Sequence, residues 1–96
     1  MNFRETAEQL LWKTHTPPPL VQEAWREAAQ ACLQAAQCEE RDPLSWAAIR
    51  TARYARCAVR AAEEYERMAY KNDGCRDAYG DVMWAVEESR REANGS

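Results

Sequence analysis

Alanine at helical spacing is the feature that most constrains this chain. Within residues 20–40, Ala24, Ala28, Ala31 and Ala35 recur every three or four positions, which places them on one face of an α-helix. Alanine supplies 18 of the 44 apolar residues of the whole chain. An alanine face buries little area, but it lets a second helix approach closely, near the short end of the ~8–10 Å range of interaxial distances. The pattern therefore predicts closely packed helices.

Three breaks divide the chain into four expected helices. The prolines at 17–19 end the first helix, because each proline disfavours the α conformation in the residue before it. Asp42 and Pro43 start the third, since a capping carboxylate is followed by a residue that has no amide to satisfy. Gly74, free to adopt the left-handed conformation, separates the third from the fourth. We expect helices at about residues 3–14, 20–40, 43–71 and 75–93.

The predicted fold is all-α: one domain, residues 1–96, forming a compact antiparallel bundle of three long helices with a short N-terminal helix packed across them. The links between the long helices are short, which favours antiparallel neighbours. Beside the alanines of the second helix, the residues expected on inner faces are Phe3, Ala7, Leu10, Thr14, Val21, Trp25, Cys32, Leu33, Tyr54, Ala58, Ala61, Ala62, Tyr65, Ala69, Ala78, Val82, Val86 and Ser89.

The four cysteines do not have the spacing of a metal site. Structural zinc sites use close C-x2–4-C pairs, whereas the nearest pair here, Cys32 and Cys38, is six residues apart. We expect no metal and no cofactor. The chain begins without the apolar core of a secretion signal, so reduced thiols buried among alanines are expected. A disulfide between Cys57 and Cys75, which flank the third break, is the alternative.

No catalytic constellation is visible. The single histidine, His15, stands beside the prolines, and Ser45 falls in the first turn of the expected third helix. Neighbouring acids such as Glu63 and Glu64 diverge by about 100° on a helix and cannot share a proton, and Glu63 is expected to pair with Arg67 four residues on. We expect a protein that is not an enzyme. No apolar run reaches the ~18–20 residues of a membrane helix, so a cytoplasmic location without membrane contact is expected.

A basic stripe on the third helix is the first surface feature with functional meaning. Residues 50–60 contain four arginines and no acid, although the chain as a whole carries a charge of −3. The basic side chains that lie within about 60° of one another on this helix are Arg53, Arg56, Arg60, Arg67 and Lys71, with Arg50 just outside. Such a stripe suits carboxylates or phosphates. The structural alternative is pairing with Glu39, Asp81, Glu87 or Glu88 on neighbouring helices.

Tryptophan placement is the second feature. Trp25 lies on the apolar side of its helix, but Trp84 projects opposite Val82 and Val86, and Trp12 projects opposite Phe3. Tryptophan and arginine are typical anchors of protein interfaces. For Trp84, contact with another helix or with a second copy of the chain is an equal alternative. Trp12 is expected to fold onto the prolines at 17–19.

These features predict a small acidic helical module that binds another protein through the outer faces of the third and fourth helices. By size class alone, such chains are often inhibitors, for example phage anti-defence (anti-CRISPR) proteins, antitoxins or immunity proteins. A homodimer or assembly protein is one alternative. Nucleic-acid binding through the arginine stripe is the other, and the net negative charge argues against it. The predicted binding residues are Arg53, Arg56, Arg60, Arg67, Asp77, Asp81, Trp84 and Glu88.

Overall fold

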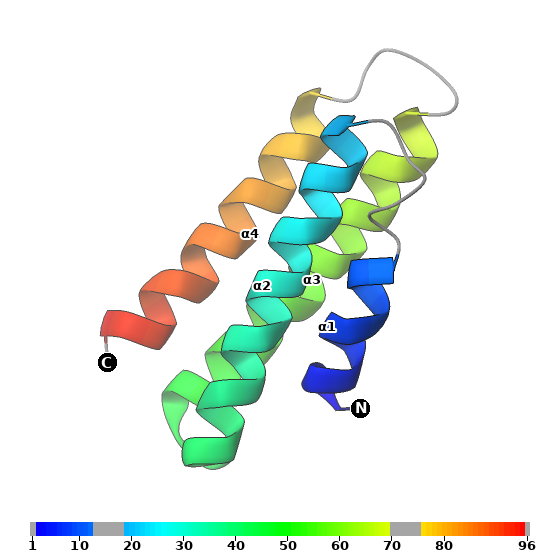
Figure 1. Ribbon diagram of the computed structural model, residues 1–96. Coiled ribbons are helices and arrows are strands. Elements are labelled where there is room, and N and C mark those ends of the chain that lie inside the picture. Colours follow the sequence, from blue (N-terminus) through cyan, green and yellow to red (C-terminus); the bar gives the residue numbers. More distant parts are fainter. Residues whose placement is uncertain (1, 13–18, 70–75, 96) are drawn as a thin grey trace.

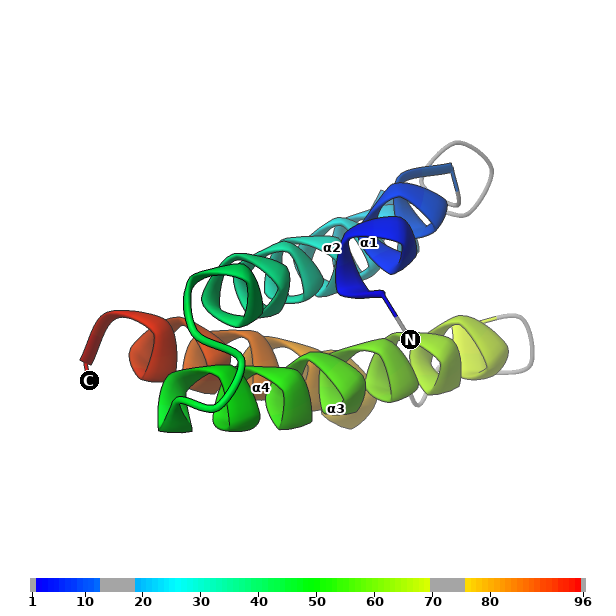
Figure 2. The same cartoon turned by 90° about the horizontal axis from the view of Figure 1, so that it is seen from below.

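The computed structural model describes residues 2–12, 19–69 and 76–95, without the side chains of 76, 77 and 95. These residues form four helices and no strand: α1 (Phe3–Trp12), α2 (Pro19–Arg41), α3 (Trp46–Ala69) and α4 (Arg76–Gly95). Successive helices run in opposite directions along the bundle (Figure 1). They form two layers, α1 with α2 and α3 with α4 (Figure 2). The predicted all-α bundle is confirmed.

The start of α3 corrects the sequence prediction. The helix begins at Trp46 and not at Pro43, because Ser45 is its cap: the Ala48 amide donates to Ser45 Oγ at 3.1 Å. Asp42 instead stabilises the preceding turn, where its Oδ1 accepts from the Leu44 amide at 3.2 Å. The expected helix ends at residues 14 and 71 lie outside the described residues.

The alanine face of α2 forms the centre of the core. Ala24, Ala28, Ala31 and Ala35 are fully buried, together with Trp25. Val21 and Cys32 are buried as predicted, whereas Leu33, also predicted inside, is only partly buried. The inner residues predicted for α4 are all buried, as are those predicted for α1 as far as Leu10; Thr14 lies outside the described residues. The alanine pattern thus correctly identified the surface on which the other helices pack.

The inner face of α3 is rotated relative to the prediction. Its buried residues include Ala55, Ala58 and Ala62, whereas Tyr54 and Ala61 are only partly buried. Ala69, also predicted inside, is partly buried at the end of the helix. The reason is that α3 packs against both α2 and α4, so Tyr54 lies at the edge of the buried face beside Trp84 of α4.

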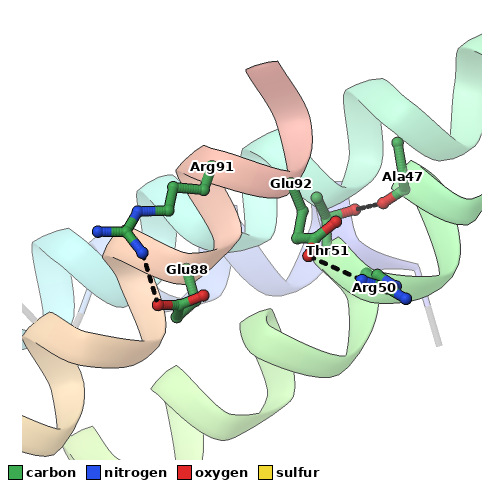
Figure 3. Close-up of polar contacts among 6 residues, drawn as sticks. All are labelled: Ala47, Arg50, Thr51, Glu88, Arg91 and Glu92. Carbon is green, nitrogen blue, oxygen red and sulfur yellow. Dashed lines mark hydrogen bonds and ion pairs between the residues drawn. The ribbon is translucent and has the colours of Figure 1, made fainter. Parts of the chain in front are cut away.

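Buried polar atoms have partners throughout the described residues. Trp25 Nε1 donates to Glu66 Oε2 on α3 at 2.6 Å, which links the largest core side chain to a second helix. Thr51 Oγ1 donates to the Ala47 carbonyl at 2.6 Å (Figure 3). Ser89 Oγ lies 3.3 Å from Gln34 Oε1 and connects α4 to α2.

Replacement of the central tryptophan tests this core. We expect Trp25→Ala to lower the free energy of unfolding by about 3–5 kcal/mol, because it removes a fully buried indole and leaves a cavity. Urea denaturation followed by circular dichroism measures the loss. The matched control is Trp12→Ala, since Trp12 is 78% exposed and its removal should change stability by less than about 1 kcal/mol. Equal losses of unfolding free energy in both variants would contradict the assignment of Trp25 to the core.

One ion pair joins α1 to the end of α2. Arg4 Nε and Nη2 donate to the two carboxylate oxygens of Glu40, each at 2.9 Å. The fork matches the carboxylate geometry, and Arg4 holds the pKa of the Glu40 carboxyl below its usual value. This contact supplements the packing of Phe3, Ala7 and Leu10.

The pH dependence of this ion pair follows from the direction in which the Glu40 pKa is shifted. Because the pKa of Glu40 is lowered in the folded chain, its contribution to stability is present above the unfolded pKa and is lost as pH falls through the folded value. We expect Arg4→Gln to raise the Glu40 pKa in an NMR titration and to reduce the acid dependence of unfolding. Arg41→Gln is the control and should leave the Glu40 titration unchanged.

Candidate functional site

The outer surface of the α3–α4 layer carries several of the side chains that the sequence predicted to bind a partner. It faces away from α1 and α2 (Figure 2). We call it the α3–α4 face and define it by Trp46, Arg53, Tyr54, Cys57, Asp81, Trp84 and Glu88. The helices beneath it are held by buried alanines and valines, so its side chains stand on a packed support.

Trp84 stands at the seam between the two helices. Its ring meets the ring of Tyr54 edge to face, with centroids 5.7 Å apart and planes at 81°. Such contacts fix the orientation of an aromatic ring and contribute about 1 kcal/mol. Trp84 nevertheless remains 56% exposed. Trp84 therefore contacts another helix and also remains accessible to solvent. Its indole is held in place without being buried.

A second apolar group, which was not predicted from the sequence, lies at the start of α3. Leu44 is 87% exposed and Trp46 is 71% exposed, while Ile49 is also exposed. The Arg50 guanidinium carbon lies 5.4 Å from the centroid of the Trp46 ring. A signal was present: positions 46, 49 and 53 have the i, i+3, i+7 spacing of one helix face, opposite the alanines.

A hollow connects this apolar group to the seam. Its volume is about 310 Å³, and its lining residues are Trp46, Ile49, Arg50, Arg53 and Tyr54. Since Tyr54 also contacts Trp84, this partly buried ring links the exposed Trp46 of α3 to the exposed Trp84 of α4. The hollow is small and open, and its lining offers aromatic faces and guanidinium groups together.

The predicted arginine stripe divides into three environments. Arg53 and Arg60 are exposed, and no carboxylate of the described residues lies within ion-pair distance of either. Arg56 lies on the side of α1, with its guanidinium carbon 5.9 Å from the centroid of the Phe3 ring. Arg60 lies on the same side and lines a hollow with Phe3 and Leu10. Arg67 pairs with Glu64 at 2.9 Å, and not with Glu63 as predicted. Lys71 lies outside the described residues.

The acids of α4 occupy the other half of the face. Glu88 accepts from Arg91 at 3.3 Å (Figure 3), and Glu87 lies 4.0 Å from the same guanidinium. Asp81 is exposed and makes no ion pair with the described residues. The side chain of Asp77 lies outside the described residues.

The expected pairing of the arginine stripe with neighbouring helices is therefore wrong for Arg53, Arg56 and Arg60. Glu87 and Glu88 are engaged by arginine of their own helix, and Glu39 makes no ion pair with the described residues. Helical neighbours at i+3 and i+4 need no rearrangement of the backbone to meet, which favours them over partners on another helix.

One ion pair also joins α3 to α4 across the seam. Arg50 Nη1 donates to Glu92 Oε1 at 3.2 Å (Figure 3). Together with the contact between Tyr54 and Trp84, it connects the outer sides of the two helices.

The cysteines differ in accessibility. Cys32 and Cys38 are buried, as predicted, but Cys57 is exposed on the α3–α4 face, which corrects the prediction for that residue. All three are free thiols, and Cys75 lies outside the described residues. Burial raises the pKa of the Cys32 thiol to about 11. In the part of the chain that the structure describes, no group of His, Cys, Asp or Glu is arranged to hold a metal ion.

Comparisons with known proteins add no relative: no family model, no curated protein and no solved structure matches the chain. Among the described helices, none combines the length and the apolar character needed to cross a membrane.

Thiol alkylation tests the predicted accessibility. At pH 8 we expect iodoacetamide to modify Cys57 rapidly in the folded protein and Cys32 only after unfolding, because Cys32 is buried and remains protonated. Peptide mass spectrometry identifies the modified residue.

The raised pKa of Cys32 also predicts a pH dependence of stability. The free energy of unfolding is unaffected below the pKa of the unfolded thiol and decreases as pH rises toward 11. Cys32→Ala should weaken this alkaline loss, and an unchanged loss would contradict it.

Proposed function

We propose that the chain is a non-enzymatic module that binds a protein through the α3–α4 face. The observation that carries the proposal is the pair of exposed rings of Trp46 and Trp84, linked by the partly buried Tyr54. Beside them stands Arg53, whose guanidinium has no carboxylate within ion-pair distance in the described residues. Aromatic residues and arginine dominate the energetic centres of protein interfaces. Exposed tryptophan of this extent is otherwise costly for a surface in water.

The geometry supports a binding role in two further ways. The Trp84 ring is already oriented by Tyr54, so less conformational freedom is lost on association. The face also contains both an apolar centre and charges of opposite sign, which provides orientation as well as affinity. The hollow between Trp46 and Tyr54 offers room for one side chain of a partner.

A protein partner fits this face better than a nucleic acid. Glu88 and Asp81 lie on the same face as the arginines, and their charge would repel phosphates. Arg56 lies against Phe3 on the side of α1. A continuous row of basic side chains along α3 would need Arg56 on the α3–α4 face. Inhibition of the bound protein, in the manner of anti-defence proteins, antitoxins or immunity proteins, stays a prediction from size class.

Site-specific photocrosslinking tests the proposal. A benzoylphenylalanine replacing Cys57, at the centre of the face, should form a protein adduct in a lysate of the native host. The same probe replacing Gln37, exposed on α2, should form none. Gel electrophoresis and mass spectrometry detect the adduct and its mass.

Variants of the face connect the adduct to the proposed residues. Arg53→Glu and Trp84→Ala should each reduce the adduct by about tenfold or more, the effect of ~1.4 kcal/mol. Both are expected to remain helical, since Arg53 is exposed and Trp84 is only half covered. Arg41→Glu is the matched charge control and should leave the adduct unchanged. Adducts of equal yield from Cys57 and Gln37, or insensitivity to these variants, would contradict the proposal.

A further inference from the structure

A second hollow lies between α1 and α3, on a side of the bundle that the proposed function does not use. Its volume is about 420 Å³, which lies within the ~300–1,000 Å³ typical of small-molecule sites. Three helices contribute to its lining, with Phe3 and Leu10 of α1, Cys32 of α2, and Arg56, Val59 and Arg60 of α3. None of these residues lines the hollow beside Trp46, so the two sites are separate.

The way in which α1 is held accounts for this hollow. α1 packs on α2 through Phe3 and Leu10, and the ion pair between Arg4 and Glu40 joins it to the end of the same helix. α3 belongs to the other layer (Figure 2). Cys32 is a fully buried residue of α2, so its place in the lining means that the hollow extends inward as far as α2.

Two arginines line this hollow without an acid to pair with. Arg56 and Arg60 are four residues apart on α3, and no carboxylate of the described residues lies within ion-pair distance of either. Like charges at this spacing repel each other along a helix. The Phe3 ring lies 5.9 Å from the guanidinium carbon of Arg56, which restricts where that group can lie. An anion between the two arginines offsets the repulsion and accepts charge-assisted hydrogen bonds from both.

We propose that the hollow between α1 and α3 binds a small amphiphilic anion, in which a carboxylate or phosphate head is joined to an apolar chain. The head lies between Arg56 and Arg60, and the chain enters the hollow beside Phe3, Leu10 and Val59. Guanidinium groups bind either head, because both carry paired oxygens that match the spacing of their donors. This site is additional to the α3–α4 face and does not depend on the proposed function.

The lining favours a small molecule over a macromolecule. Phe3 and Leu10 are each only 5% exposed, so a protein surface that rests on the rim cannot contact them, whereas a slender chain that enters the hollow can. Among the described lining residues Glu63 is the only acid, and it follows Arg60 by three positions. Its charge directs an anionic head toward Arg56 and opposes the row of phosphates that a nucleic acid would bring.

Titration with matched ligands tests the site. Octanoate and octyl phosphate are the two probes, and isothermal titration calorimetry should show one binding site; the tighter of the two identifies the preferred head. Octanol, which lacks the charge, and acetate, which lacks the chain, should each bind at least about tenfold more weakly. In methyl NMR spectra octanoate should shift the signals of Leu10 and Val59 but not those of Val82, which is buried in α4 away from the hollow.

Variants of the arginines connect binding to the hollow. Arg56→Gln and Arg60→Gln should each weaken octanoate binding by about tenfold, because each removes one charged donor to the head. Arg53→Gln is the matched control and should bind octanoate normally, since Arg53 is also exposed and unpaired among the described residues but lies on the α3–α4 face. All three side chains are exposed, so the melting temperature should stay the same.

The outcomes decide the proposal in either direction. Binding that needs both the charge and the chain, and that decreases in Arg56→Gln and Arg60→Gln alone, supports it. Absence of binding by both probes overturns it. Octanol that binds as tightly as octanoate, an equal loss in Arg53→Gln, or unshifted Leu10 and Val59 signals would also overturn it, because the contact would then lie elsewhere on the surface.

Discussion

The contact between the alanine face of α2 and its neighbours is the interaction on which the rest of the structure depends. Ala24, Ala28, Ala31 and Ala35 are fully buried, and they leave space for the indole of Trp25 to fill the core. Small side chains allow the helices to lie close, so a chain with few large aliphatic residues still forms a packed interior. Trp25 adds a hydrogen bond to Glu66, which connects this contact to α3.

The small size of the core residues also affects the surface. Because alanine fills the interior, several large apolar side chains stay outside, among them Trp46, Ile49 and Trp84. They gather on the α3–α4 layer, where Tyr54 holds Trp84 at the seam. Of the arginines beside them, Arg50 pairs with Glu92 on α4, whereas Arg53 has no carboxylate of the described residues within ion-pair distance, and Glu87 and Glu88 pair with Arg91 within α4. The small residues thus form the interior, and the large apolar residues that remain outside form the proposed binding face.

Much of the fold followed from local patterns. The periodicity of alanine identified the inner face of α2, and the breaks gave four helices with bounds close to those observed. The start of α3 was missed because two capping signals, Asp42 with Pro43 and then Ser45, stand three residues apart, and the geometry of the turn selects the second. Tyr54 was placed inside because a wheel shows which residues share a face, but not how far a neighbouring helix covers it.

The candidate site was predicted less completely, for the same reason. Trp84 and Arg53 were identified from spacing, and they lie on the α3–α4 face, joined through Tyr54. Arg56 shares their stripe on the wheel, yet α1 packs beside it and brings Phe3 under its guanidinium. Trp46 was not predicted to be part of the site, although its side chain is more exposed than that of Trp84.

The sequence by itself determined that the chain is helical, which residues face inward on α1, α2 and α4, and that arginine and tryptophan lie on outer faces. These properties depend on periodicity and capping, which act within a few residues of chain. Only the tertiary structure decided which charges are paired, how far Trp84 is covered, and that Arg56 and Arg60 lie beside α1. Those properties depend on the height and rotation of one helix against another, which are set by packing between residues distant in the sequence.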